Sequence, residues 1–319
     1  QRQMCIRDRV NTTLTDLYLK FNKNLLAANN AFEIVVDSKE ELAGLPQNVI
    51  DNAAAEAEAR GHEGKWVFTL HAPSRLAVLQ YAQNRDLREK MWRGYTSNAT
   101  KEGMDNRPVI VEILKNRARK AELLGFKDYA AYAVSDKMAA TPEAAEALLM
   151  KVWEPAKAKV AEEVAEMQKL SDESGNDFKI APWDYYFFAE KVRQKKYALD
   201  EAAIKPYFAV DSVRKGIFEM ANRLYGITFT ELPDAPKYHK DVKVYEVKDA
   251  EGKHLAVFMT DYFTRASKRQ GAWMEELKTS WVNPDGSVER PIVYNVGNFA
   301  PPTADAPALL SIDDVQTMF

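Results

Sequence analysis

Residues 290–319 read RPIVYNVGNFAPPTADAPALLSIDDVQTMF and carry the signals on which our prediction of the fold depends. Closely spaced apolar residues predict a short strand over residues 292–296. A proline-rich connection follows, and Ser311 then stands at the position of a helix N-cap. Asp314 lies three residues later, where its carboxylate completes a capping box. The stretch therefore predicts a strand, a turn-rich connection and the beginning of a helix.

The helix that Ser311 opens carries an apolar stripe, formed by Ile312, Val315 and Phe319 at i, i+3 and i+7 spacing. The sequence stops about two turns into this helix, and isolated helices of that length are marginal in water. We therefore expect the chain to be part of a longer protein. We also expect the stripe to be exposed and to cause some aggregation.

The composition is that of a globular protein, with 46% hydrophobic and 29% charged residues among 319. A net charge of −3 gives no electrostatic reason to expect nucleic acid as a partner. The sequence holds no apolar run long enough for a membrane helix, which needs about 18 residues. The one cysteine, Cys5, excludes an internal disulfide and fits a reducing compartment. Our expectation is a monomer in the cytoplasm, or a periplasmic or envelope form if a signal peptide is missing.

Residues 1–9, QRQMCIRDR, match nothing that follows in pattern and contain no apolar core of a secretory signal. They resemble translated read-through of sequencing adapters. We interpret them as a non-native leader and leave them out of the fold prediction.

Helical periodicity dominates residues 10–225. Thr141 followed by Pro142 is a strong helix start, and Pro155 is expected to kink or restart that helix. Gly226 is expected to end the last helix of this region. The predicted helices cover residues 12–28, 46–60, 85–95, 107–124, 142–170, 182–196 and 211–225, and a short helix is expected to begin at Ser38.

The pattern changes to period two after Gly226. Residues 242–247 and 254–259 flank a turn at 249–252 and predict a hairpin. Residues 273–281 alternate as well, and residues 226–319 therefore hold a small β-sheet and the start of the final helix. The fold class is mostly α, with a helical region over 10–225 and one modest sheet near the C-terminal end.

The common catalytic motifs are missing from the sequence: it has no G-x-S-x-G, no Walker loop and no G-x-G-x-x-G. The four histidines are His62, His71, His239 and His254, and no two of them have the i, i+4 spacing of a helical zinc pair. His62-Glu63 begins such a motif, but Trp66 occupies the i+4 position. We therefore assign no catalytic or metal-ligating residue and expect no zinc to bind to this chain.

Several collinear blocks resemble the thimet-oligopeptidase-like family of zinc metallopeptidases, and its bacterial peptidyl-dipeptidase branch looks closest. The blocks run through the whole chain from about Val10; those of the sheet region are Tyr238–Val242, Val244–Val247, Thr260–Phe263, Arg265, Lys268 and Gly271–Met274. The resemblance implies an elongated, zincin-like helical body and zinc in the full-length protein. It also implies short peptides as substrates and release of C-terminal dipeptides. In that family the H-E-x-x-H zinc helix would follow Phe319 directly, so no catalytic residue can be carried onto this sequence.

The resemblance further implies that the strand before the zinc helix is an edge strand that pairs with the extended substrate. The residues that this assigns to substrate binding are Val293, Tyr294, Asn295, Val296, Gly297 and Asn298. Gly297 would let another backbone approach closely. An ordinary interior strand is the alternative for this segment. For the whole protein, an endo-acting oligopeptidase of the same family and a non-enzymatic helical binding module remain open.

Overall fold

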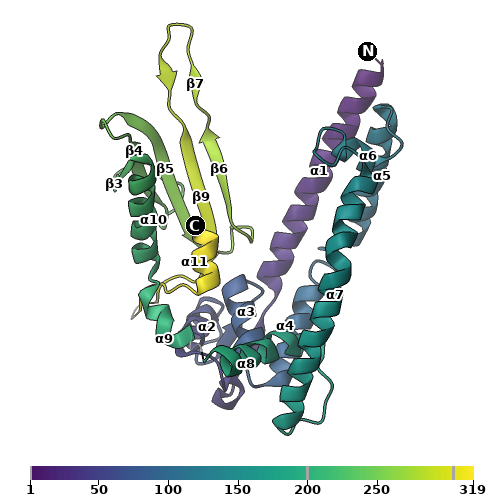
Figure 1. Ribbon diagram of the computed structural model, residues 1–319, viewed down its shortest axis with the longest axis vertical. Coiled ribbons are helices and arrows are strands. Elements are labelled where there is room, and N and C mark those ends of the chain that lie inside the picture. Colours follow the sequence, from purple (N-terminus) through teal and green to yellow (C-terminus); the bar gives the residue numbers. More distant parts are fainter. Residues whose placement is uncertain (1, 199–200, 304–305) are drawn as a thin grey trace. The chain divides into compact units, whose positions relative to one another are not determined.

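The computed structural model describes residues 2–198, 201–303 and 306–319, and Figure 1 shows its helices and strands. The chain divides into two compact units. The first consists of residues 1–34 and 78–196, and the second of residues 35–77 and 197–319. The prediction of a mostly helical protein with one small sheet near the C-terminal end is confirmed.

The first unit is built from helices. Val10 and Leu14 of α1 pack against Val109 and Ile113 of α5, so the helix predicted over residues 12–28 faces a core. Helix α1 begins at Arg2, well before residue 12, because residues 2–9 continue the same helix. Their non-native origin stays a prediction. The helices are α1 (Arg2–Ala31), α4 (Arg85–Thr96), α5 (Arg107–Leu123), α6 (Tyr129–Val134), α7 (Pro142–Glu173) and α8 (Tyr185–Tyr197), and α3 (Ala72–Tyr81) ends in this unit.

Helix α7 starts as the sequence predicts. The Ala144 N–H donates to Thr141 Oγ1 at 3.2 Å, and Pro142 occupies the first helical position. The helix then continues through Pro155 to Glu173 as one element. A proline inside a helix removes one backbone hydrogen bond but need not end the helix when the remaining turns hold it.

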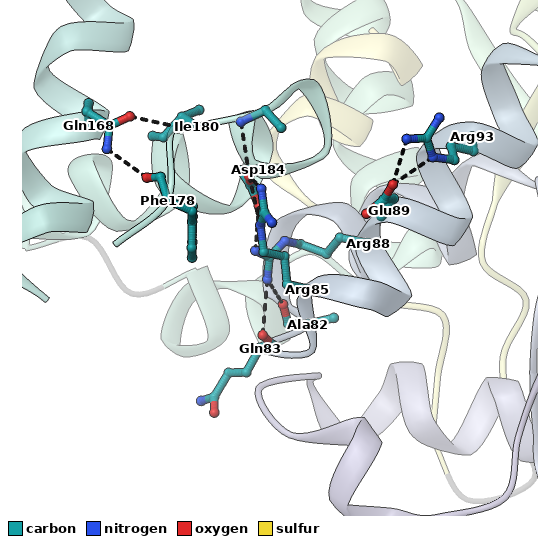
Figure 2. Close-up of polar contacts among 11 residues, drawn as sticks. Ala82, Gln83, Arg85, Arg88, Glu89, Arg93, Gln168, Phe178, Ile180 and Asp184 are labelled. Atoms are coloured by element: carbon teal, nitrogen blue, oxygen red, sulfur yellow. Dashed lines mark hydrogen bonds and ion pairs between the residues drawn. The ribbon is translucent and has the colours of Figure 1, made fainter. Parts of the chain in front are cut away.

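A buried ion-pair cluster joins α4 to the short 3₁₀ turn Pro182–Asp184 that precedes α8 (Figure 2). Asp184 is fully buried and accepts hydrogen bonds from Arg85 Nη2 and Arg88 Nη2, each at 2.8 Å. Arg88 is only 2% exposed, and its Nη1 also donates to the Ala82 carbonyl at 2.7 Å. Burial alone would raise the pKa of Asp184, but the hydrogen bonds from both arginines outweigh burial and hold the pKa below its usual value.

The second unit carries the sheet. Five strands lie in the order β3-β4-β5-β9-β6, and every neighbouring pair is antiparallel except β5 and β9, which are parallel (Figure 1). The predicted hairpin is confirmed as β4 and β5. The sheet strands are β3 (Thr228–Glu231), β4 (Lys243–Lys248), β5 (His254–Phe263), β6 (Trp273–Lys278) and β9 (Ile292–Phe299).

Smaller elements complete the second unit. Two short pairs of strands stand apart from the main sheet, and one helix, α10, covers part of it. The elements are β1 (Ile34–Val36), α2 (Gln47–Ala59), β2 (Trp66–Phe68), α9 (Glu201–Ile204), α10 (Val210–Tyr225), β7 (Trp281–Val282), β8 (Val288–Glu289) and α11 (Ile312–Met318), with 3₁₀ turns at Lys39–Leu42 and Lys205–Tyr207.

Helix α10 packs on one face of the sheet through aromatic rings. The Phe218 ring stacks on Phe229 of β3 at 4.0 Å between centroids, and meets the Tyr245 ring of β4 edge-on at 5.0 Å. Gly226 ends the helix with φ of 72°, a left-handed conformation that favours glycine. The predicted helix end at Gly226 is therefore confirmed.

Helix α11 has the predicted capping box. The Asp314 N–H donates to Ser311 Oγ and the Ser311 N–H donates to Asp314 Oδ2, both at 3.0 Å. The predicted exposure of the stripe is wrong for Ile312 and Val315, which are half-buried, because Val315 packs against the core cluster that contains Met318. Only Phe319, 62% exposed, remains as expected.

Candidate substrate-binding site

Strand β9 contains the residues that the sequence assigned to substrate binding, and it lies inside the sheet. It pairs in parallel with β5 from Val257↔Ile292 onward, and in antiparallel fashion with β6 up to Trp273↔Val296. Both of its edges are therefore occupied over most of residues 293–298. The edge-strand interpretation of this segment is wrong, because residues 273–278 form the strand beyond it.

Gly297 also has a different neighbour from the one expected. A Cβ at this position would lie 2.7 Å from the Phe299 ring and 3.2 Å from the carbonyl oxygen of Tyr262. Tyr262 belongs to β5, so the backbone that approaches Gly297 is that of the adjacent strand. Glycine is needed here for packing within the sheet.

The open edge on this side of the sheet is β6. Within the described ranges, no strand pairs with its outer side. Its side chains from Met274 to Leu277 are exposed, Met274 by 64% and Leu277 by 58%. Tyr294 of β9 donates its hydroxyl to Glu275 Oε2 at 2.8 Å and ties the two strands together. A strand with unpaired backbone groups can accept an extended peptide as a further strand.

A buried ionic cluster fixes the segment that leads into β6. Asp261, at the end of β5, is 1% exposed and accepts two hydrogen bonds from Arg265, at 2.7 and 2.8 Å. Lys268 Nζ donates to Asp261 Oδ1 at 2.9 Å and to the Phe263 carbonyl at 2.7 Å. The Tyr238 hydroxyl donates to Asp261 Oδ2, which also accepts from Arg265, at 3.0 Å. One carboxylate thus organises the whole turn between β5 and β6.

The end of β9 holds the same turn from its other side. Asn298 Nδ2 donates to the carbonyl oxygens of Arg269 at 3.0 Å and Gly271 at 2.7 Å. Gln270 Nε2 donates to the Leu70 carbonyl at 3.1 Å. These contacts fix the backbone immediately before Trp273, where β6 begins. The position of the open edge is therefore set by side chains from β5 and β9 and by the contact of the Gln270 side chain with the backbone after β2.

The charge state of the cluster follows from its contacts. Burial alone would raise the pKa of Asp261, but hydrogen bonds from Arg265 and Lys268 outweigh burial and leave the pKa below its usual value. Burial and the neighbouring Asp261 raise the pKa of Tyr238, so its hydroxyl stays protonated and remains a donor. Burial lowers the pKa of Lys268, and its hydrogen bond to Asp261 opposes that shift. Asp261 is therefore ionised at neutral pH and is hydrogen-bonded to Arg265, Lys268 and Tyr238.

The described residues do not form a zinc site. No three His, Cys, Asp or Glu side chains within them come together in a group that could hold a metal ion. His254 Nδ1 lies 3.2 Å from Glu246, His239 Nδ1 accepts the Asp241 N–H at 3.3 Å, and His71 Nδ1 lies 3.1 Å from Thr69 Oγ1. Those three histidines have contacts of their own, and zinc does not fit the side chains that surround them.

Sequence reasoning missed the Asp261 cluster as a physical unit. It identified Asp261, Arg265 and Lys268 only as members of a resembling block. Their spacing of four and seven residues matches a helix face, but here the chain leaves a strand and turns. The position of Asp261 in an apolar strand was a usable signal, because a carboxylate buried in such a strand is nearly always paired with a cation.

The described part of the chain contains no helix with both the length and the apolar character needed to cross a bilayer.

Comparison with known proteins places these features in a family context. The profile of peptidase family M3 matches residues 78–319. The dipeptidyl carboxypeptidase of Escherichia coli (strain K12) is 40% identical over 313 residues, which cover 97% of this chain and 45% of that protein. The oligopeptidase A of the same organism is 34% identical over 313 residues, 97% of this chain and 46% of that protein. An Arabidopsis thaliana relative named probable cytosolic oligopeptidase A is 36% identical over 329 residues, which cover 98% of this chain and 46% of that protein.

The chain thus spans less than half the length of these relatives, although they match nearly all of it. The resemblance to thimet-oligopeptidase-like peptidases is confirmed by the profile and by the names of the relatives. The profile covers both the helices that follow residue 78 and the complete five-stranded sheet. The chain belongs to peptidase family M3.

Proposed function

We propose that the chain is part of a zinc-dependent peptidase that hydrolyses short peptides and releases C-terminal dipeptides. The proteins named dipeptidyl carboxypeptidase are 40% identical to this chain. The proteins named oligopeptidase A are 33–36% identical over nearly the same stretch. An endo-acting oligopeptidase is therefore the second candidate.

The proposal rests on the open edge of β6 in a chain of this family. We propose that the substrate backbone adds to β6 as a sixth strand, since backbone pairing gives affinity without requiring a particular peptide sequence. Residues 293–298 then act indirectly: β9 pairs with β6, and Asn298 anchors the turn before it. Side-chain contacts with Met274 and Glu276, both exposed, would add preference among peptides.

We further propose that the zinc ligands and the catalytic residues of this peptidase are not among these 319 residues. The proposal is supported by the contacts of the histidines and by the 45% share of the relative that the chain covers. Purified chain should contain far less than one zinc per molecule and should cleave no peptide. Stoichiometric zinc together with zinc-dependent hydrolysis would contradict this.

Backbone addition can be tested on the chain itself. An extended peptide should protect amides of residues 273–278 from hydrogen exchange. N-methylation of alternate peptide residues, in the register that faces β6, should weaken binding about tenfold or more, because each methyl group removes a hydrogen-bond donor. N-methylation in the opposite register is the matched control. Equal binding of both methylated peptides, or protection elsewhere in the second unit, would refute the role of β6.

The reaction type needs the longer protein. With N-acylated peptides, a dipeptide-releasing enzyme should yield successive C-terminal dipeptides and should lose activity when the C-terminus is amidated. Internal cleavage of amidated peptides would instead favour the endo-acting candidate. This experiment tests the reaction type alone. The role of β6 in binding is tested separately by the methylated peptides.

A monomer in the cytoplasm remains our proposal for the assembly and the compartment. The name of one Arabidopsis thaliana relative, probable cytosolic oligopeptidase A, supports it, whereas another relative from the same plant is named as chloroplastic/mitochondrial. Fractionation and light scattering of the longer protein would test both points.

A further inference from the structure

The helical unit contains a pocket that the peptidase proposal does not use. It lies where α4, the end of α7 and α8 meet, next to the buried Asp184 cluster (Figure 2), and its volume is about 300 Å³. Its lining includes Arg85, Arg88 and Lys191 but no acidic side chain. A cavity of this size is at the lower end of the range for small-molecule sites.

The pocket has an excess of positive charge. Two arginines and one lysine line it, and Asp184, which is bonded to both arginines, compensates a single charge. The acidic residues next to the lining residues in the sequence form ion pairs with other side chains. Glu190 pairs with Arg193 at 2.7 Å, and Glu173 pairs with Lys195 at 3.0 Å.

The cations of the pocket retain hydrogen-bonding capacity. Asp184 accepts from Nε and Nη2 of Arg85 and from Nη2 of Arg88. Arg88 Nε is buried and has no hydrogen-bond partner within the described residues. Since buried donors are nearly always satisfied in folded proteins, an unpartnered guanidinium nitrogen beside a cavity indicates a position for an acceptor.

Aromatic rings hold the cations in place. The Arg85 guanidinium stacks on Phe178 at 4.1 Å, the Arg88 guanidinium stacks on Phe187 at 4.1 Å, and Lys191 Nζ lies 4.7 Å from the Phe187 centroid. Stacking covers the faces of the guanidinium groups. Asp184 and the Ala82 and Gln83 carbonyls take up most of their N–H edges, so Arg88 Nε is the buried donor that remains for an oxyanion. Gln168 fixes the backbone that follows Phe178, because it donates to the Phe178 carbonyl at 3.0 Å and accepts the Ile180 N–H at 2.8 Å (Figure 2). The pocket is therefore preformed.

We infer that this pocket binds a small organic anion, whose carboxylate or phosphate group lies against Arg85, Arg88 and Lys191 and whose flat apolar part lies against the phenylalanine rings. The oxyanion supplies the acceptor that the buried arginine lacks and offsets the excess positive charge. The mixture of aromatic walls with cations favours an aromatic anion over a bare inorganic one. The inference is independent of the proposed reaction, because it rests on the first unit alone.

The probes are phenyl phosphate, benzoate and phenol, titrated into the 319-residue chain by calorimetry at constant ionic strength. Either anion should bind, and uncharged phenol should bind at least about tenfold more weakly, since a hydrogen bond to a charged group is lost. Preference for phenyl phosphate identifies a phosphate ester, and preference for benzoate identifies a carboxylate. Binding of phenol as tight as that of both anions would overturn the inference, as would no binding of either anion.

The location is tested with Lys191→Gln, a half-buried residue outside the Asp184 cluster whose replacement leaves that cluster intact. The variant should bind the preferred anion about tenfold more weakly than the original chain. Lys195→Gln, on the same helix and paired with Glu173, should bind as the original chain does. The anion should also slow hydrogen exchange over residues 83–88 and 174–191. Equal binding by Lys191→Gln, or protection outside these segments, would refute the site.

Discussion

Replacing Asp261 with asparagine should loosen the turn that positions β6. The carboxylate is 1% exposed and accepts hydrogen bonds from Arg265, Lys268 and Tyr238. Asparagine keeps the size of the side chain but removes the charge, so the buried ammonium of Lys268 loses its counter-ion. Removal of one partner from a buried ion pair costs about 3–5 kcal/mol.

The lower end of that range applies here. Lys268 keeps its hydrogen bonds to the carbonyl oxygens of Asp261 and Phe263, and the Arg265 side chain is 20% exposed and can regain water. We therefore expect Asp261→Asn to destabilise the turn by about 3 kcal/mol. Adding Lys268→Met should restore part of the loss, because the second change removes the uncompensated charge.

Hydrogen exchange of residues 264–278 at increasing urea concentrations measures this locally, since a chain with two compact units need not unfold in one step. Glu219→Gln is the matched control: it removes an exposed ion pair with Arg223 and should change stability by less than about 1 kcal/mol. A loss below about 0.5 kcal/mol for Asp261→Asn would refute the reasoning, as would strict additivity of the two substitutions.

The same cluster predicts a pH dependence with a definite sign. The pKa of Asp261 in the folded chain lies below its usual value of 3.8, so the unfolded chain takes up a proton first as the pH falls. The stabilisation is complete above the usual pKa and is lost as the pH falls through the folded pKa. The difference in opening free energy between the original chain and Asp261→Asn should therefore shrink below about pH 4. A difference that grows on acidification would contradict the ionised cluster.

Four further substitutions test the remaining structure. Asp184→Asn should destabilise the helical unit by about 3 kcal/mol, measured by urea unfolding, because two buried or half-buried arginines lose their shared carboxylate. Gly297→Ala should lower the free energy of unfolding by about 1–3 kcal/mol, since its Cβ would press on the Tyr262 carbonyl. Gly216→Ala has nothing near its Cβ inside α10 and should raise the free energy of unfolding by about 0.5–1 kcal/mol. Ser311→Ala should cost about 1 kcal/mol in the local stability of α11, seen as faster exchange over residues 312–318.

Local features of the fold could be predicted from the sequence because their causes are local. The capping box of Ser311, the start at Thr141-Pro142 and the stop at Gly226 depend on residues within one turn of each other. The β4–β5 hairpin likewise follows from two alternating runs around a short turn. Each of these predictions agrees with the structure.

The order of the strands could not be predicted in the same way. Residues 273–278 and 292–299 both alternate, and alternation predicts a strand without specifying its neighbours. The chain places β9 between β5 and β6 through a parallel pairing that joins residues 35 positions apart, such as Val257 with Ile292. An edge position was predicted for β9 because it stands next to the final helix in sequence, whereas β6 is the strand at that edge of the sheet.

The two buried carboxylates, Asp184 and Asp261, could likewise not be recognised from the residues that surround them in the sequence. Asp184 meets Arg85 and Arg88 across 99 and 96 positions, a distance at which no periodicity carries information. Asp261 meets its two cations, Arg265 and Lys268, within seven positions, but only after a turn whose path the sequence pattern does not specify. In each unit one buried carboxylate orients two cations, and those cations in turn fix a surface: the cationic pocket in the first unit and the β6 edge in the second. A binding surface built in this way depends on its charges being complete, so loss of either carboxylate should disturb binding as well as stability.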